Sequence, residues 1–105
     1  MMSEQIQAYG RFQEFYPYYL AEHSNRTCRR LHFTGSALVL AMLTYILITG
    51  SWLLLATLPL IGYGFAWVGH FLFEKNKPAT FRYPLYSLMG DWVMFKDMLT
   101  GKIEW

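Results

Sequence analysis

Residues 31–73 contain 43 consecutive positions without an aspartate, glutamate, lysine or arginine. A chain of 105 residues buries too small a core to hide such a run from water, whereas a bilayer accepts it. Charged residues make up only 15% of the chain, well below their usual share in soluble domains. We therefore expect a membrane protein, and the length allows one membrane domain that comprises residues 1–105.

Gly50 and Ser51 divide the uncharged run into two apolar helices, which we predict at residues 27–49 and 52–73. Each helix approaches the roughly 20 residues that cross a bilayer at about 1.5 Å per residue. A connection of two residues is too short to return across the membrane, so the helices must be antiparallel. The sequence therefore predicts a transmembrane helical hairpin.

Two further helices flank the predicted hairpin. Residues 4–23 carry apolar and aromatic side chains at three- and four-residue spacings, which is typical of an amphipathic helix on a membrane interface. We expect Pro17 to kink or interrupt this helix. Residues 84–100 have too many charges to span, so we expect an interfacial or hairpin-packed helix there. The predicted fold class is an all-α membrane protein.

The orientation of the hairpin follows from the charges at its ends. The turn is uncharged, and basic residues flank both helices, namely Arg26, Arg29, Arg30, Lys75, Lys77 and Arg82. Because basic loops stay on the cytoplasmic side, we expect both termini in the cytoplasm. In a bacterial protein the membrane would be the inner one.

Several classes of function are excluded by composition. The net charge of +2, with no basic patch on a polar surface, argues against nucleic-acid binding. The single Cys28 can form neither an internal disulfide nor a paired zinc site. The first thirty residues lack the apolar core of a cleaved signal peptide. Nothing in the sequence specifies an oligomeric state.

Two histidines lie at equal distances from the turn, because His32 precedes Ser51 by 19 residues and His70 follows it by 19. In an antiparallel hairpin both lie about 28 Å from the turn, at the cytoplasmic rim, where two imidazoles can reach one ion. Small residues let membrane helices approach closely. Such residues occur near both histidines, at Gly35, Ser36, Gly62 and Ala66.

Two more side chains can join this site. Glu74 lies one turn after His70 and therefore shares its helix face. His23 precedes a predicted break at Ser24-Asn25, so its segment can fold back over the rim. Three neutral imidazoles with a carboxylate suit iron(II) or zinc better than magnesium or calcium.

Two alternatives stay open at this point. The histidines could simply be interfacial residues of a small, non-enzymatic membrane scaffold protein. Alternatively, His32 and His70 could ligate a haem between the two helices.

Two blocks of the sequence are recognisable. The first consists of Phe15-Tyr16, Tyr19-Leu20, Glu22-His23, Asn25, Leu31-His32 and Gly35. The second consists of Gly69-His70-Phe71-Leu72-Phe73-Glu74-Lys75, Pro78-Ala79 and Pro84-Leu85. Together they resemble the 2-hydroxy fatty acid dioxygenase family of small membrane proteins, over residues 12–101.

The resemblance implies an iron(II)-dependent oxidoreductase that uses dioxygen to shorten a 2-hydroxy fatty acid by one carbon, which is α-oxidation. His23, His32 and His70 would be the catalytic and metal-binding residues. From its place one turn after His70, we expect Glu74 to be a metal ligand or a close partner of one. The substrate can chelate iron(II) through its carboxylate and hydroxyl oxygens. Its tail would lie along apolar helices and its headgroup near basic residues at the rim, namely Arg29, Arg30, Lys75 or Lys77.

Overall fold

The structure, a computed structural model, describes residues 9–105, which form helices and loops but no strand. The all-α fold class is therefore confirmed for this part of the chain. The elements in chain order are α2 (Phe12–Ala21), α3 (Arg26–Thr49), η1 (Trp52–Ala56), α4 (Thr57–Val68), η2 (Gly69–Glu74), η3 (Ala79–Phe81) and α5 (Pro84–Leu99).

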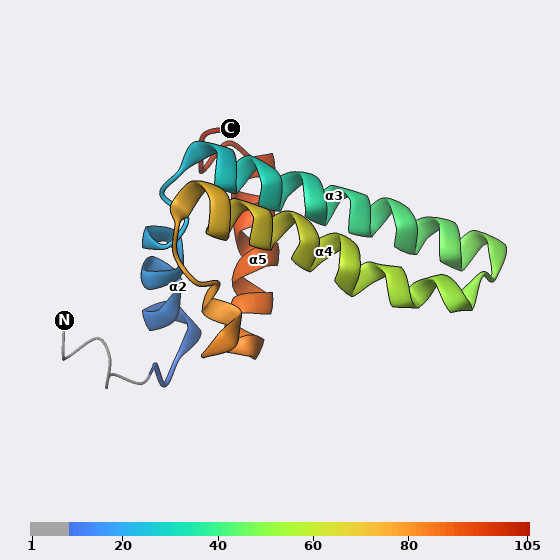
Figure 1. The fold of residues 1–105 in the computed structure, drawn as a ribbon, viewed down its shortest axis with the longest axis horizontal. Coiled ribbons are helices and arrows are strands. Elements are labelled where there is room, and N and C mark those ends of the chain that lie inside the picture. The colour runs from blue at the N-terminus through green and yellow to red at the C-terminus, as the bar shows by residue number, and fades with distance from the viewer. Residues whose placement is uncertain (1–8) are drawn as a thin grey trace.

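The two apolar helices form a hairpin that extends along the longest dimension of the molecule (Figure 1). The side chain of Asn25 caps α3 by accepting a hydrogen bond from the Cys28 N–H at 3.1 Å. The helix ends at Gly50, whose φ of 70° is left-handed and favours glycine. The second limb, Trp52–Glu74, runs through η1, α4 and η2 in succession.

Both limbs of the hairpin are long and apolar enough to cross a membrane. Near the turn, many apolar side chains point outward, and Leu53 and Leu60 are 94% and 75% exposed. At Gly35 the limbs are in close contact, because an added Cβ would lie 2.9 Å from the Cβ of Phe65. The predicted close approach at small residues is therefore present at this position.

Helices α2 and α5 lie across the end of the hairpin that is opposite its turn (Figure 1). They meet through a small core formed by Phe15, Tyr19, Ala79, Met94 and Met98. At Gly90 a Cβ would lie 2.9 Å from the Tyr19 ring, so the close contact of α2 with α5 requires glycine there. Of the two predicted placements of the C-terminal helix, the structure has the hairpin-packed one.

The described part of the N-terminal helix differs from its prediction in where α2 begins, in the absence of an interruption at Pro17 and in what covers its aromatic face. Residues 4–8 lie outside the described residues, and the helix begins only at Phe12, after a glycine at position 10 that disfavours helix. Pro17 lies inside α2 without ending it. The aromatic face is not free to lie on a membrane, because α5 buries Phe15 and Tyr19 completely.

Candidate metal centre

Three histidines from three segments converge where the hairpin meets α2 and α5. His23 follows α2, His32 lies in the second turn of α3, and His70 lies in η2. All three are buried, with exposed fractions of 1%, 6% and 2%. The Nε2 atom of His23 lies 3.1 Å from that of His32 and 2.9 Å from that of His70. One ligand atom from each histidine fits within 4.8 Å of the others.

The outer ring nitrogens define which tautomer each histidine adopts. The Nδ1 atom of His23 lies 2.6 Å from the Tyr19 carbonyl oxygen, and that of His32 lies 3.0 Å from the Cys28 carbonyl oxygen. A carbonyl oxygen can only accept, so both Nδ1 atoms must carry the proton. His70 Nδ1 lies 2.7 Å from Asn76 Oδ1, which is likewise an acceptor.

As a consequence, all three Nε2 atoms present lone pairs to one another. None of the three imidazoles in this tautomer has an N–H to donate at Nε2, so their short separations are repulsive unless a cation lies between them. Two ligands held at right angles about 2.1 Å from one ion would lie about 3.0 Å apart. The observed separations of 2.9 and 3.1 Å match this spacing. These two separations fit ligands of one ion, and all three ligand atoms lie within 4.8 Å of one another.

Burial keeps the site in its metal-binding protonation state. The pKa of His23 is well below its ordinary value, first because of burial and then because of the neighbouring His32 and His70. A neutral imidazole is the form that binds a metal. His23 is therefore ready to bind at neutral pH without losing a proton.

Asn76 was not identified from the sequence, and it connects two of the segments. Besides accepting from His70, it donates from Nδ2 to the carbonyl oxygen of Glu22 at 3.1 Å. The loop after η2 turns back on η2 itself, because the Asn76 N–H donates to the His70 carbonyl oxygen at 3.0 Å. The only local sequence signal is an asparagine before Lys77-Pro78, which is typical of any turn.

A tyrosine and an aspartate complete the surroundings of His23. The Tyr19 ring stacks on the His23 imidazole, with centroids 4.0 Å apart. Its hydroxyl donates a hydrogen bond to Asp91 of α5. Burial raises the pKa of Asp91 to about 6, although the bond from Tyr19 lowers it. The sequence signal that was overlooked is a carboxylate placed among the apolar residues of α5.

Glu74 lies near the centre but is not part of the three-histidine group. Its carboxylate accepts hydrogen bonds from the Ser24 hydroxyl at 3.3 Å and from the Asn25 N–H. It therefore connects the end of η2 to the loop between His23 and α3. This arrangement favours a positioning role over direct binding of the metal.

The four basic residues expected near a substrate carboxylate have different surroundings. Arg29 donates to the carbonyl oxygens of His23 and Ser24 at 3.1 and 2.9 Å. Arg30 donates to the Trp105 carbonyl oxygen at 2.9 Å and lies over its ring. Lys75 and Lys77 are exposed. None of the four lines either of the two cavities next to the histidines in the described part of the chain.

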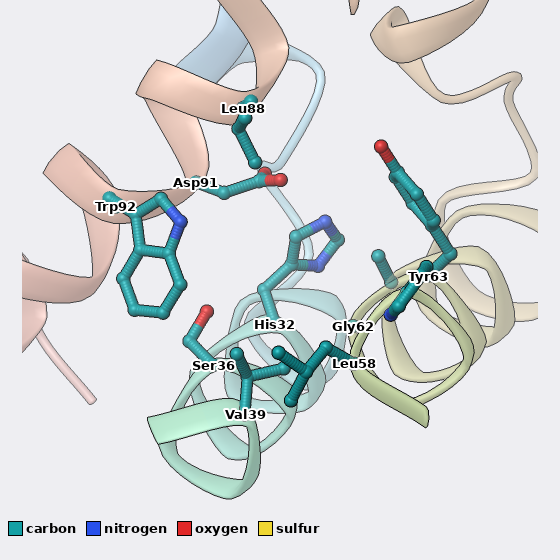
Figure 2. A pocket seen from close by; sticks show the side chains of 11 residues that line it. His32, Ser36, Val39, Leu58, Gly62, Tyr63, Leu88, Asp91 and Trp92 are labelled. Atoms are coloured by element: carbon teal, nitrogen blue, oxygen red, sulfur yellow. The ribbon is translucent and has the colours of Figure 1, made fainter. Parts of the chain in front are cut away.

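An apolar cavity of about 290 Å³ opens beside His32, between α3, α4 and α5 (Figure 2). Its apolar walls include Val39, Leu58, Pro59, Leu88 and Trp92. A smaller cavity of about 20 Å³ lies against all three histidines. The two share four lining residues, His32, Tyr63, Ala66 and Asp91, so the apolar cavity adjoins the cavity against the three histidines.

Comparison with known families gives one match. The family model described as "2-hydroxy-palmitic acid dioxygenase Mpo1-like" matches residues 9–103. The chain belongs to the Mpo1-like family. No curated protein and no solved structure matches the chain.

The Mpo1-like match spans the three histidines and every residue that lines the two cavities. It confirms the resemblance seen in the two sequence blocks. The name of the family describes a dioxygenase whose substrate is a 2-hydroxy fatty acid. Such a substrate has a polar head and a long apolar tail, and the Mpo1-like chain here combines a polar centre with an apolar cavity.

Proposed function

We propose that this protein is an iron(II)-dependent dioxygenase that shortens a 2-hydroxy fatty acid by one carbon at the cytoplasmic rim of a membrane. The observation that carries the proposal is the convergence of three Nε2 lone pairs at the inner end of an apolar cavity. Membership in the Mpo1-like family supplies the substrate class.

His23, His32 and His70 would hold the metal through Nε2. Bound iron(II) would supply a centre at which the hydroxy acid and dioxygen exchange electrons. Three protein nitrogens leave further positions open, as non-haem oxygenase sites require. The outer bonds to Tyr19, Cys28 and Asn76 hold each ring in its tautomer, and such partners usually matter almost as much as the ligands.

The overall reaction balances without another reductant. One 2-hydroxy acid and one dioxygen contain the atoms of the acid shortened by one carbon, one carbon dioxide and one water. The bond that breaks joins the carboxyl carbon to the hydroxyl-bearing carbon. The two carbons that this bond joined lose four electrons in total, which is the number that one dioxygen accepts on full reduction. The proposed turnover therefore needs no reductant besides the substrate itself.

The apolar cavity would hold the first part of the acyl tail. Its walls come from α3, α4 and α5, and His32 and Asp91 form the end nearest the metal centre (Figure 2). An apolar wall excludes water and leaves orientation to a few polar groups. The rest of the tail would continue along the exposed apolar surface of the hairpin, where it meets lipid.

The basic residues would act around the site rather than in it. We assign Arg29 to holding the loop that carries His23, because it donates to two carbonyl oxygens of that loop. Lys75 and Lys77 are exposed beside the centre and would attract fatty acid anions to the rim. The same charges would keep this end of the hairpin on the cytoplasmic side.

Reporter fusions after Ser51 and after Trp105 should therefore report opposite compartments.

The haem alternative receives no support from the geometry. The Nε2 atom of His23 lies within 3.1 Å of His32 and 2.9 Å of His70, in the space that a macrocycle between them would need. The scaffold alternative leaves three buried, mutually repulsive imidazoles without a purpose. The metal-dependent enzyme accounts for both observations.

The decisive experiment combines metal analysis with a paired substrate assay. Protein purified without oxygen should contain about one iron per chain. With dioxygen it should convert 2-hydroxyhexadecanoic acid to pentadecanoic acid and leave hexadecanoic acid unchanged, and a chelator should abolish this activity. Equal turnover of both acids, or turnover after complete iron removal, would overturn the proposal.

A further inference from the structure

The face of α5 that meets the metal centre carries two polar side chains, Ser87 and Asp91. They are four residues apart and therefore lie one above the other on one helix face. Both line the small cavity against the histidines.

Ser87 is buried without a partner. It is 5% exposed, and its hydroxyl has no hydrogen-bond partner within residues 9–105. Leaving a buried hydroxyl unpaired costs about 1–3 kcal/mol, so most such groups are paired in proteins. Ser87 lines the small cavity of about 20 Å³ against the histidines, so one polar group of a molecule that enters from the adjoining apolar cavity would be in position to supply the missing partner.

Asp91 has one oxygen in use and one available. Its Oδ1 accepts the hydrogen bond from Tyr19, and its Oδ2 has no hydrogen-bond partner among the described residues. No lysine or arginine of residues 9–105 forms an ion pair with this carboxylate. Figure 2 shows the carboxylate pointing into the cavity beside the His32 ring.

A second tyrosine–aspartate pair shows which part of this arrangement is structural. Tyr16 of α2 donates to Asp97 Oδ2 of α5 at 2.8 Å, in the same sense as Tyr19 donates to Asp91. Asp97 is 3% exposed but lines neither cavity. A tyrosine–aspartate bond therefore suffices to join α2 to α5. Only Asp91 also presents an oxygen to the cavity.

We propose that Ser87 and Asp91 form the headgroup subsite, in which Ser87 donates to the substrate carboxylate and Asp91 Oδ2 accepts from the 2-hydroxyl. A 2-hydroxy carboxylate carries an acceptor and a donor on adjacent carbons, and α5 presents the complementary donor and acceptor. The assignment rests on the proposed function and names the residues that recognise its substrate. It makes Asp91 the residue that distinguishes a 2-hydroxy acid from a plain fatty acid.

The test measures binding to metal-free protein in detergent without dioxygen, so that neither chelation nor turnover contributes. Equilibrium dialysis would give the dissociation constants of 2-hydroxyhexadecanoic and hexadecanoic acid. Loss of a hydrogen bond to a charged group weakens binding by about tenfold. Wild type should therefore prefer the hydroxy acid by about tenfold, and Asp91→Asn should bring the ratio close to one. The ratio is the readout, because removing the negative charge would also strengthen binding of both anions.

Two variants complete the comparison. Ser87→Ala should weaken binding of both acids by about the same factor, since both contain the carboxylate. Asp97→Asn is the matched control, because it alters the other tyrosine–aspartate pair of α5 and should keep the wild-type ratio. Iron content measured on reloaded protein would show that the histidine site is intact in each variant.

The proposal is overturned if wild type shows no preference, if Asp91→Asn keeps it, or if Asp97→Asn loses it equally. Undiminished binding of both acids by Ser87→Ala would remove Ser87 from the subsite. Failure of the proposed function is a separate result. In that case wild type would bind the hydroxy acid preferentially but form no shortened acid with iron and dioxygen.

Discussion

The two ends of the hairpin are built from the same two limbs but differ in what they expose and in what they bury. Near the turn, Leu47, Ile48 and Leu53 point outward, and Ile46 is the only buried residue between positions 44 and 56. At the other end, α2 and α5 cover the limbs and enclose three histidines. The turn end thus presents apolar surface, whereas the covered end buries polar groups.

The difference shows what a single hairpin cannot do alone. A buried imidazole is tolerated only when its N–H groups find acceptors. Two straight limbs offer few acceptors, because their backbone carbonyls are used within each helix. At the covered end, segments outside the two limbs supply acceptors. His23 bonds to the Tyr19 carbonyl oxygen near the end of α2, and His70 bonds to Asn76 in the loop after η2. Two of the three acceptors for the histidine N–H groups thus lie outside the two limbs, and only His32 bonds to a carbonyl oxygen of its own limb.

The largest expected effect is loss of the metal ligands. Replacing His70 by alanine removes one of three nitrogens, and iron content should fall from about one per chain to near zero, with loss of activity. Elemental analysis of protein purified without oxygen would measure this. His23→Ala and His32→Ala should behave alike, and full iron content in all three variants would eliminate the site.

Next in size is the outer partner of His70. Asn76→Ala removes both the acceptor for Nδ1 and the bond to Glu22, so iron affinity should fall by about 10- to 100-fold. Asn76→Asp keeps an acceptor oxygen and should lose less. Competition with a chelator of known affinity would compare the three proteins. Equal affinity in all of them would show that this partner does not orient the ligand.

Alanine substitutions at two glycines of the second limb distinguish the effect of packing from that of helix propensity. At Gly69 an added Cβ would lie 2.9 Å from Cys28 Sγ and 3.2 Å from Cys28 Cα, whereas at Gly64 nothing lies within 4 Å. Gly69→Ala should therefore push η2 away from α3 and lower the free energy of unfolding by about 1–3 kcal/mol. Gly64→Ala should cause no loss. Denaturant unfolding in detergent would contradict the explanation if both variants lost equal stability.

A smaller effect should appear on acidification of metal-free protein. The folded state keeps His23 neutral because burial lowers its pKa, while the unfolded chain takes up the proton near pH 6.5. The free energy of unfolding should therefore fall below about pH 6.5, by up to about 1.4 kcal/mol per pH unit for this imidazole.

Asp91 acts in the opposite sense on acidification. Its pKa is raised to about 6, so the folded state takes up a proton there before the unfolded chain does, and this stabilises the fold as the pH falls. Asp91→Asn should thus make the loss between pH 6 and pH 4 steeper than in wild type. Parallel stability curves for the two proteins would refute this assignment.

The smallest effect is expected at the turn end. Leu53 is 94% exposed and lies far along the hairpin from the histidines, so Leu53→Ala should leave iron content and turnover unchanged. Iron analysis and the substrate assay would check this alongside His70→Ala. A large loss of iron in Leu53→Ala would mean that the two ends are not independent.

By itself the sequence determined the hairpin and the equal distance of His32 and His70 from its turn. An uncharged run of 43 residues with one break can form little else, and equal spacing from Ser51 places His32 and His70 side by side. The break at Ser24-Asn25 predicted that the segment with His23 folds back toward His32 and His70, because a break in the helix permits that change of direction. These features depend on helix length and local turn chemistry, which are encoded within short windows of sequence.

Only the tertiary structure decided what surrounds the three histidines. Asn76, Tyr19 and Asp91 become neighbours of the histidines through the packing of α2, α5 and a returning loop, and Glu74 is drawn away to the Ser24-Asn25 loop. The aromatic face of α2 could have lain on lipid or on protein. The face packs on protein because Gly90 of α5 has no side chain, which lets the Tyr19 ring lie in close contact with the helix. Such contacts join residues up to 72 positions apart, and their energies depend on shape that local patterns do not contain.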